Sequence, residues 1–200
     1  RVTKVAGVSA SFFGFFDMRP SQGRFFGPAE DQVPMGSLVA VLAWNYWRTA
    51  FGEGDVLGKL IRIGSLDYTI VGVAPEDFVG TVQGRPPEIF IPVTTVPANM
   101  QPYNKDTYFT AYNWDWVEVL VRRKSGVSEA AGAAQLTVAY RQSRRIQRET
   151  NPRVLPDSVA HPRAMVAALR SAAGPNPGPE TRVTKVAGVS ASFFGFFDMR

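Results

Sequence analysis

Few side chains in this sequence have the types and spacing that catalysis requires. Glu30 and Asp31 are adjacent carboxylates, and His161 is the only histidine. Paired carboxylates can act as general acid and base, and a histidine can activate a serine hydroxyl. No Gly-x-Ser-x-Gly turn is present to expose such a serine. Because proline and acids also favour the first turn of a helix, Pro28 to Asp31 fit a helix start. A hydrolase is therefore an alternative, and no catalytic residue is assigned.

Metal and nucleotide sites are not predicted either. The sequence has no cysteine, which excludes disulfides and thiolate metal sites, and Asp157 is the only acid near His161. The segment Gly52–Lys59 resembles a phosphate-binding loop. Its glycines are one residue too close, however, and Leu60 stands where serine or threonine would bind magnesium. We expect no cofactor, no metal and no ATP hydrolysis.

Two groups of residues are candidates for contact surfaces. The segment 93–113 is long, polar and aromatic, and such loops are often functional, although it could also drape over the core. Four arginines recur at spacings of three and four on one helical face, which could bind phosphate or be solvated. The net charge of +5 comes without a nucleic-acid recognition motif, so no nucleic-acid partner is expected. The candidate contact residues are Tyr103, Tyr108, Phe109, Tyr112, Arg141, Arg144, Arg145 and Arg148.

The elements that must position these residues follow from the hydrophobic spacing. Apolar or alternating runs predict strands at 2–8, 38–42, 60–63, 68–73, 88–92 and 115–123. Aromatic residues predict short helices at 9–16 and 43–51. Ser128 is expected to cap one long helix over about 128–150, which Asn151-Pro152 ends. The pattern predicts an α+β fold with mixed or antiparallel sheets, and the length of 200 residues suits one domain or two small lobes.

An ordered series of short motifs runs through roughly residues 8–150. It comprises Arg19-Pro20, Gly23–Phe26, Glu30-Asp31, Val39–Leu42, Trp47, Phe51-Gly52, Asp55–Gly58, Ile61–Ile63, Tyr68–Pro75, Phe78–Gly80, Glu118–Arg122 and Gly126–Ala130. This series resembles the MacB-like periplasmic core domain, the extracytoplasmic module of FtsX/MacB-type ABC transporter permeases.

The resemblance implies a non-catalytic module inserted between the first two transmembrane helices of a permease in the inner (cell) membrane. On the periplasmic side, the module would couple ATP-driven motion to substrate export or to lipid or lipoprotein handling. The implied partners are the permease's own transmembrane helices, a separate or fused ATP-binding subunit, and a second copy in a homodimer. The alternative is a free-standing extracytoplasmic binding module that uses the aromatic segment 93–113.

The expected core domain covers residues 1–172, with a lobe at about 20–97 inserted in a lobe formed by 1–19 and 113–172. Residues 173–181 read as a Pro/Gly linker, and residues 182–200 repeat residues 1–19 letter for letter. The repeat fits a coding sequence read past its own start, or a segment that swaps into a neighbouring chain as an added strand. With no initiator Met, no signal peptide and no run of roughly 18 apolar residues, a fragment or excised domain is expected.

Overall fold

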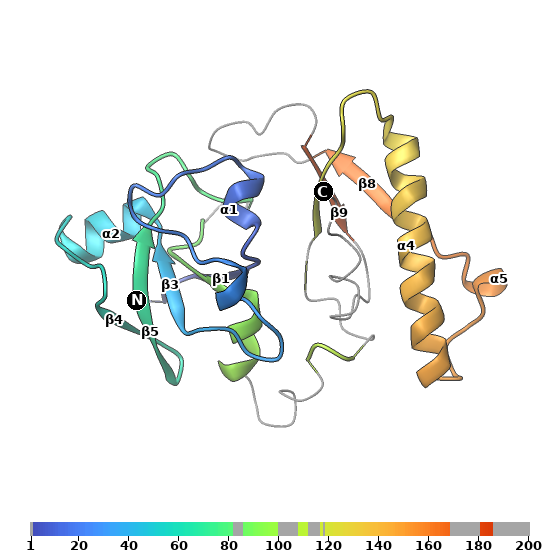
Figure 1. Ribbon diagram of the computed structural model, residues 1–200, viewed down its shortest axis with the longest axis horizontal. Coiled ribbons are helices and arrows are strands. Elements are labelled where there is room, and N and C mark those ends of the chain that lie inside the picture. The colour runs from blue at the N-terminus through green and yellow to red at the C-terminus, as the bar shows by residue number, and fades with distance from the viewer. Residues whose placement is uncertain are drawn as a thin grey trace. The chain divides into compact units, whose positions relative to one another are not determined.

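The computed structural model describes residues 2–81, 86–99, 108–111, 117, 119–168 and 181–185. The chain divides into two compact units. The first comprises Arg1–Lys105 with Arg170–Pro177, and the second comprises Asp106–Leu169 with Gly178–Arg200. The first contains a mixed sheet with short helices, and the second contains a small antiparallel sheet and one long helix (Figure 1).

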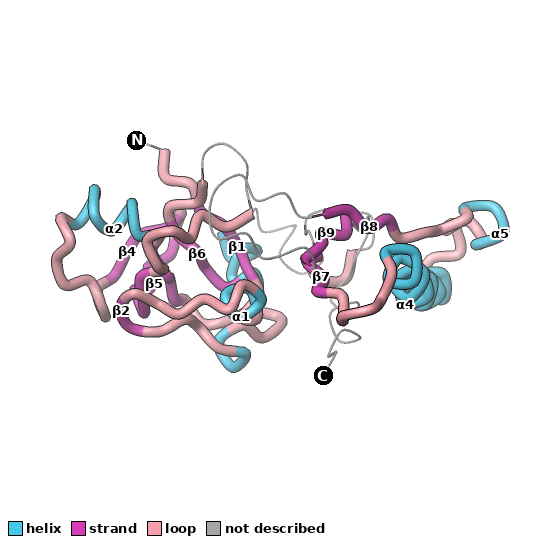
Figure 2. The backbone as a smooth tube through the Cα atoms, turned by 90° about the horizontal axis from the view of Figure 1, so that it is seen from above, coloured by secondary structure: helices cyan, strands magenta, loops and turns pink. Residues whose placement is uncertain are grey.

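A six-stranded sheet organises the first unit. Its strands are β1 (Val5–Val8), β2 (Gln22–Gly23), β3 (Val39–Leu42), β4 (Leu60–Ile63), β5 (Leu66–Val73) and β6 (Ile89–Pro92). The order is β1-β6-β3-β5-β2, and β4 also pairs with β5. The β1–β6 and β3–β5 pairs are parallel, whereas β3–β6, β4–β5 and β2–β5 are antiparallel. Figure 2 shows these strands, in magenta, within this unit.

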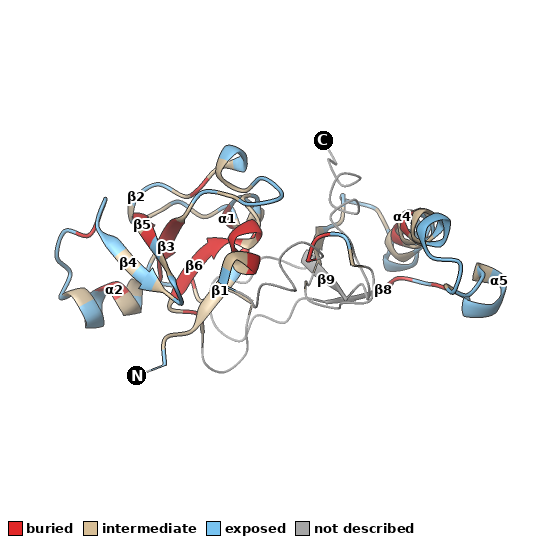
Figure 3. Cartoon of the chain, turned by 90° about the horizontal axis from the view of Figure 1, so that it is seen from below, coloured by how far each residue is buried: buried red, intermediate tan, exposed pale blue. Residues whose placement is uncertain are grey.

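Both faces of this sheet are covered. Successive side chains of a strand point to opposite faces, and those of β3 enter two different buried clusters. In β3, Val39 and Val41 belong to one buried cluster, whereas Ala40 and Leu42 belong to another. Figure 3 shows the buried residues, in red, concentrated on β3, β5 and β6. The elements packed around the sheet are α1 (Phe12–Phe15), η1 (Pro28–Glu30), α2 (Trp44–Phe51) and η2 (Val93–Asn99).

The helix α2 ends where the sequence predicts. Gly52 follows it with a φ of 58°, a left-handed conformation that glycine adopts without strain. Trp47 is buried, and its indole Nε1 donates a hydrogen bond of 2.9 Å to the Gly54 carbonyl oxygen. This bond fixes the turn after the helix to the helix itself, and thereby the path of the chain toward β4.

The second unit combines β7 (Val119–Arg122), α4 (Glu129–Thr150), α5 (Asp157–Ala160), β8 (Met165–Ala168) and β9 (Thr181–Lys185). Its strand order is β7-β9-β8, and both pairs are antiparallel. The Ser128 Oγ accepts a hydrogen bond of 3.1 Å from the Ala131 N–H and so caps α4. The α+β class and mixed sheet are confirmed, and α4 lies where the long helix was predicted. Among the described residues, none of the helices has the length and apolar character of a membrane span.

The N-terminal segment differs from its predicted placement. Val5–Val8 form β1 and pair in parallel with β6, inside the first unit, rather than in a lobe with residues 113–172. The physical reason is that β6 offers β1 an apolar partner and Phe13, just beyond β1, is buried in the same unit. The strand β9, from Thr181 to Lys185, takes up the end of the predicted linker and the start of the second copy. Residues 173–180 and 186–200 lie outside the described residues.

Candidate functional site

The first residue of the acidic pair, Glu30, is held by an arginine. The Glu30 Oε2 and Oε1 accept hydrogen bonds of 2.7 and 2.8 Å from the two terminal nitrogens of Arg24. The Oε2 also accepts a bond of 3.0 Å from the Gly27 N–H at the start of η1. The hydrogen bond from Arg24 lowers the pKa of Glu30 and raises the pKa of Arg24. Glu30 therefore stays ionised and acts as a helix-start carboxylate.

The second residue of the pair, Asp31, ties three segments together. Its Oδ2 accepts a hydrogen bond of 2.8 Å from the Ala10 N–H, just before α1. Its Oδ1 accepts bonds from the hydroxyl (2.8 Å) and the N–H (3.3 Å) of Thr94, in η2. Both carboxylates thus make structural contacts, which favours the helix-start interpretation of this pair over the hydrolase alternative.

The Arg24–Glu30 ion pair is expected to stabilise the folded state slightly, and this stabilisation should be lost in acid. Because the folded-state pKa of Glu30 lies below its ordinary value of 4.5, the stabilisation is present above that pH and is lost as pH falls through the folded-state pKa. Water screens the pair, since the Arg24 side chain is 57% exposed, so Glu30→Gln is expected to cost less than about 1 kcal/mol at pH 7. Urea unfolding measured between pH 7 and pH 3 should show that the free energy of unfolding falls less with acid in Glu30→Gln than in the wild type. An unchanged acid dependence would contradict this assignment.

Among the described residues, no hydrogen bond or ion pair joins the His161 side chain to a serine or a carboxylate. His161 is exposed and follows α5 in a left-handed conformation, with a φ of 44°. The nearby Asp157 instead forms an ion pair with Arg144, with an Oδ1–Nε distance of 3.3 Å. Within the described ranges, no three His, Cys, Asp or Glu side chains gather as metal ligands would.

The aromatic segment is described only in part, and Tyr103 and Tyr112 lie outside the described residues. Tyr108 and Phe109 are only 4% and 7% exposed, and their rings meet edge to face at 5.4 Å. Burial raises the pKa of Tyr108 to about 12. The partner-contact role of these two residues stays a prediction, and their burial favours packing within the chain.

The four arginines predicted on one face of α4 include two that bind the segment after the helix. The Arg141 Nε donates a hydrogen bond of 3.3 Å to the Pro162 carbonyl oxygen. Arg144 donates one of 2.9 Å to the Leu155 carbonyl oxygen, in addition to its ion pair. These two residues hold the segment that follows α4 against the helix. Arg141, Arg145 and Arg148 are all exposed, and the contact role of the four arginines stays a prediction.

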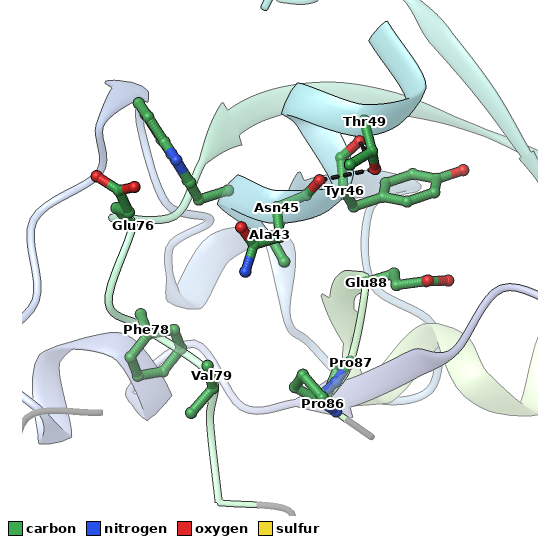
Figure 4. A pocket seen from close by; sticks show the side chains of 11 residues that line it. Ala43, Asn45, Tyr46, Thr49, Glu76, Phe78, Val79, Pro86, Pro87 and Glu88 are labelled. Carbon is green, nitrogen blue, oxygen red and sulfur yellow. Dashed lines mark hydrogen bonds between the residues drawn. The ribbon is translucent and has the colours of Figure 1, made fainter. Parts of the chain in front are cut away.

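A pocket of about 210 Å³ lies in the first unit. Its walls come from the start of α2, the loop after β5 and the residues before β6 (Figure 4). The figure shows Asn45 of α2 facing Phe78 and Val79 across the opening, with Pro86 and Pro87 beside them. The lining residues are Ala43, Trp44, Asn45, Tyr46, Thr49, Glu76, Phe78, Val79, Pro86, Pro87 and Glu88. The sequence did not predict this pocket, because its walls come from separate segments with no shared spacing.

Comparison with known proteins gives one family. The family model of the MacB-like periplasmic core domain matches residues 1–139. The macrolide export ATP-binding/permease protein MacB of Bdellovibrio bacteriovorus is 33% identical over 93 residues, which are 46% of this chain and 14% of that protein. The protein of the same name from Escherichia coli K12 is 26% identical over 133 residues, 66% of this chain and 18% of that protein. This chain therefore matches less than a fifth of the length of these relatives.

Two solved structures of permease domains also align with this chain. The periplasmic region of MacB from Actinobacillus actinomycetemcomitans aligns with a TM-score of 0.40 at 17% identity, over 49% of this chain and 41% of that one. A domain of a putative permease from Porphyromonas gingivalis aligns with a TM-score of 0.42 at 16% identity, over 94% of this chain and 68% of that one.

Proposed function

Because the chain belongs to the MacB-like periplasmic core domain family, we propose that it is the extracytoplasmic part of an ABC transporter permease in the inner membrane. The match over residues 1–139 carries this proposal. The two relatives described above are MacB-type ATP-binding/permease proteins. By analogy, the partners of this chain are the transmembrane helices of its own permease and an ATP-binding domain, fused or separate. A homodimer fits the same proposal.

We further propose that the domain works without catalysis. The acidic pair supports this view, since the Glu30 and Asp31 carboxylates accept hydrogen bonds from Arg24, Ala10 and Thr94. His161 and Asp157 support it too, because Asp157 pairs with Arg144 rather than with the histidine. The acidic pair that suggested a hydrolase therefore has a structural role.

The proposed work is mechanical coupling between the membrane and the periplasm. The division into two compact units supports this, because coupling needs bodies that keep their own structure while their relative position changes between states. ATP-driven motion of the membrane helices would move one unit against the other and drive export. The proposed cargo is a hydrophobic compound, a lipid or a lipoprotein.

The parent gene and its permease test this proposal. Hydrophobic spans of about 20 residues are expected on both sides of the domain. With the permease in proteoliposomes, deletion of the domain should abolish ATP-dependent transport and leave nucleotide binding intact. A parent gene without such spans would favour the free-standing binding module. Transport that survives the deletion would contradict the coupling role.

A further inference from the structure

The pocket beside α2 carries negative charge. Its lining includes two carboxylate side chains, Glu76 and Glu88. Glu76 is exposed at the rim, in the loop after β5. The Glu88 Oε2 accepts a hydrogen bond of 3.1 Å from the Lys4 N–H, which fixes this carboxylate at the end of the pocket nearest β6. The pocket wall thus offers one exposed and one anchored carboxylate to a bound group.

The remainder of the wall is largely aromatic and apolar. Phe78 and Pro87 are buried, whereas Trp44 and Tyr46 are half-buried at the start of α2. The Trp44 Nε1–H is a buried donor without a partner among the described residues, and it adds nothing to cation binding, because a guanidinium has no acceptor. Aromatic faces attract cations through the ring quadrupole, and they pack well against the methylene groups of long basic side chains. The wall therefore suits a group with an apolar stem and a positive end.

The positive end of the α2 helix works against this preference, because Ala43, Asn45 and Tyr46 lie at its first turn. A helix N-terminus is equivalent to roughly half a positive charge. Glu88 is already held by the Lys4 N–H, but the exposed Glu76 carboxylate carries a full charge of the opposite sign, so the balance favours a cation.

The size of the pocket limits the ligand. Small-molecule sites typically measure about 300–1,000 Å³, whereas this pocket measures about 210 Å³. That volume suits one side chain better than a whole drug-sized molecule. A planar guanidinium that stacks on an aromatic ring and binds a carboxylate matches the wall better than a compact ammonium does.

We propose that this pocket receives an arginine side chain of a partner protein, with Glu76 as its charge partner and the aromatic wall around its stem. This inference goes beyond the proposed transport role and does not depend on it, because it rests on the pocket in the first unit alone. It assigns that unit a docking position for a basic segment.

A peptide titration tests the proposal on the full chain labelled with ¹⁵N. The probes are acetyl-Gly-Arg-Gly-amide and the same peptide with neutral citrulline in place of arginine. The arginine peptide should shift the Trp44 indole N–H resonance, assigned with Trp44→Phe. Glu76→Gln should weaken its binding about fivefold. Glu53→Gln, an exposed acid beyond the other end of α2, is the matched control and should leave binding unchanged.

Three results would overturn the proposal. Equal binding of the arginine and citrulline peptides would show that charge is not recognised. Equal binding by the wild type and Glu76→Gln would remove Glu76 from the site. Free ethylguanidine that binds as tightly as the arginine peptide would indicate a small-cation site rather than a docking position for a protein.

Discussion

Replacing Phe13 with alanine is expected to destabilise the first unit by about 3–5 kcal/mol, the usual loss for a buried phenylalanine. Phe13 is 1% exposed. Its ring stacks on Phe25 at 3.9 Å and lies 5.5 Å from the ring of Phe90, in β6. The substitution would leave a cavity between α1 and the sheet. Urea unfolding followed by the fluorescence of Trp44 and Trp47, with Trp114 and Trp116 replaced by phenylalanine, should measure the loss.

The duplicated sequence supplies a matched control for this experiment. Phe194→Ala makes the same substitution in the same local sequence of the second copy. If the first copy supplies the core of the first unit, Phe13→Ala should shift the urea midpoint of this unit much more than Phe194→Ala. Equal shifts from both variants would contradict the assignment of Phe13 to this core.

Replacing Asp31 with alanine is expected to cost about 3 kcal/mol, because it leaves the N–H of Ala10 and both donors of Thr94 without their acceptor. The variant should also loosen α1 and η2 together, since Asp31 joins them. Hydrogen exchange of the Ala10 and Thr94 amides would show this as faster exchange at both positions.

Asp67→Ala is the control for Asp31→Ala. Asp67 is an aspartate that accepts a hydrogen bond of 2.9 Å from the Arg62 guanidinium. This pair is exposed, with 63% of the Arg62 side chain and 49% of the Asp67 side chain accessible. Its loss is expected to cost no more than about 0.5 kcal/mol. If the two aspartate variants were equally destabilised, Asp31 would have no special role in joining the segments.

The elements with strong local signals were predictable from the sequence. The apolar run at β3 forms a strand in which all four residues are buried. The Ser128 cap and the helical spacing after it predicted α4. In such segments, hydrophobic period and terminal residues point to the same structure, so no tertiary information is needed.

The placement of short segments depends on tertiary contacts that local patterns do not encode. The letters Val-Thr-Lys are outside any strand at residues 2–4, yet the same letters form part of β9 at residues 183–185. The partner strand, rather than local preference, decides between these outcomes. For the same reason, nothing local indicated that β1 would pair with β6.

The candidate site was harder to predict than the fold. Asp31 and Thr94 are 63 positions apart, so their hydrogen bond was invisible in the sequence, and the acidic pair looked like a candidate catalytic pair. The pocket likewise depends on Phe78 and Pro87 approaching the start of α2 in space. Reactive residue types alone therefore indicated chemistry where the structure shows hydrogen bonds that support the fold.

Distance measurement between the two units tests the coupling role most directly. Because the sequence has no cysteine, Ala50→Cys in α2 and Ala134→Cys in α4 would carry the only spin labels on the domain, and both positions are exposed. In the parent permease, with any cysteines elsewhere replaced, the distance between these labels should change between the nucleotide-free and ATP-trapped states. A control pair within the first unit, Ala50→Cys with Lys59→Cys, should keep its distance. Identical distances between the units in both states would contradict mechanical coupling by this domain.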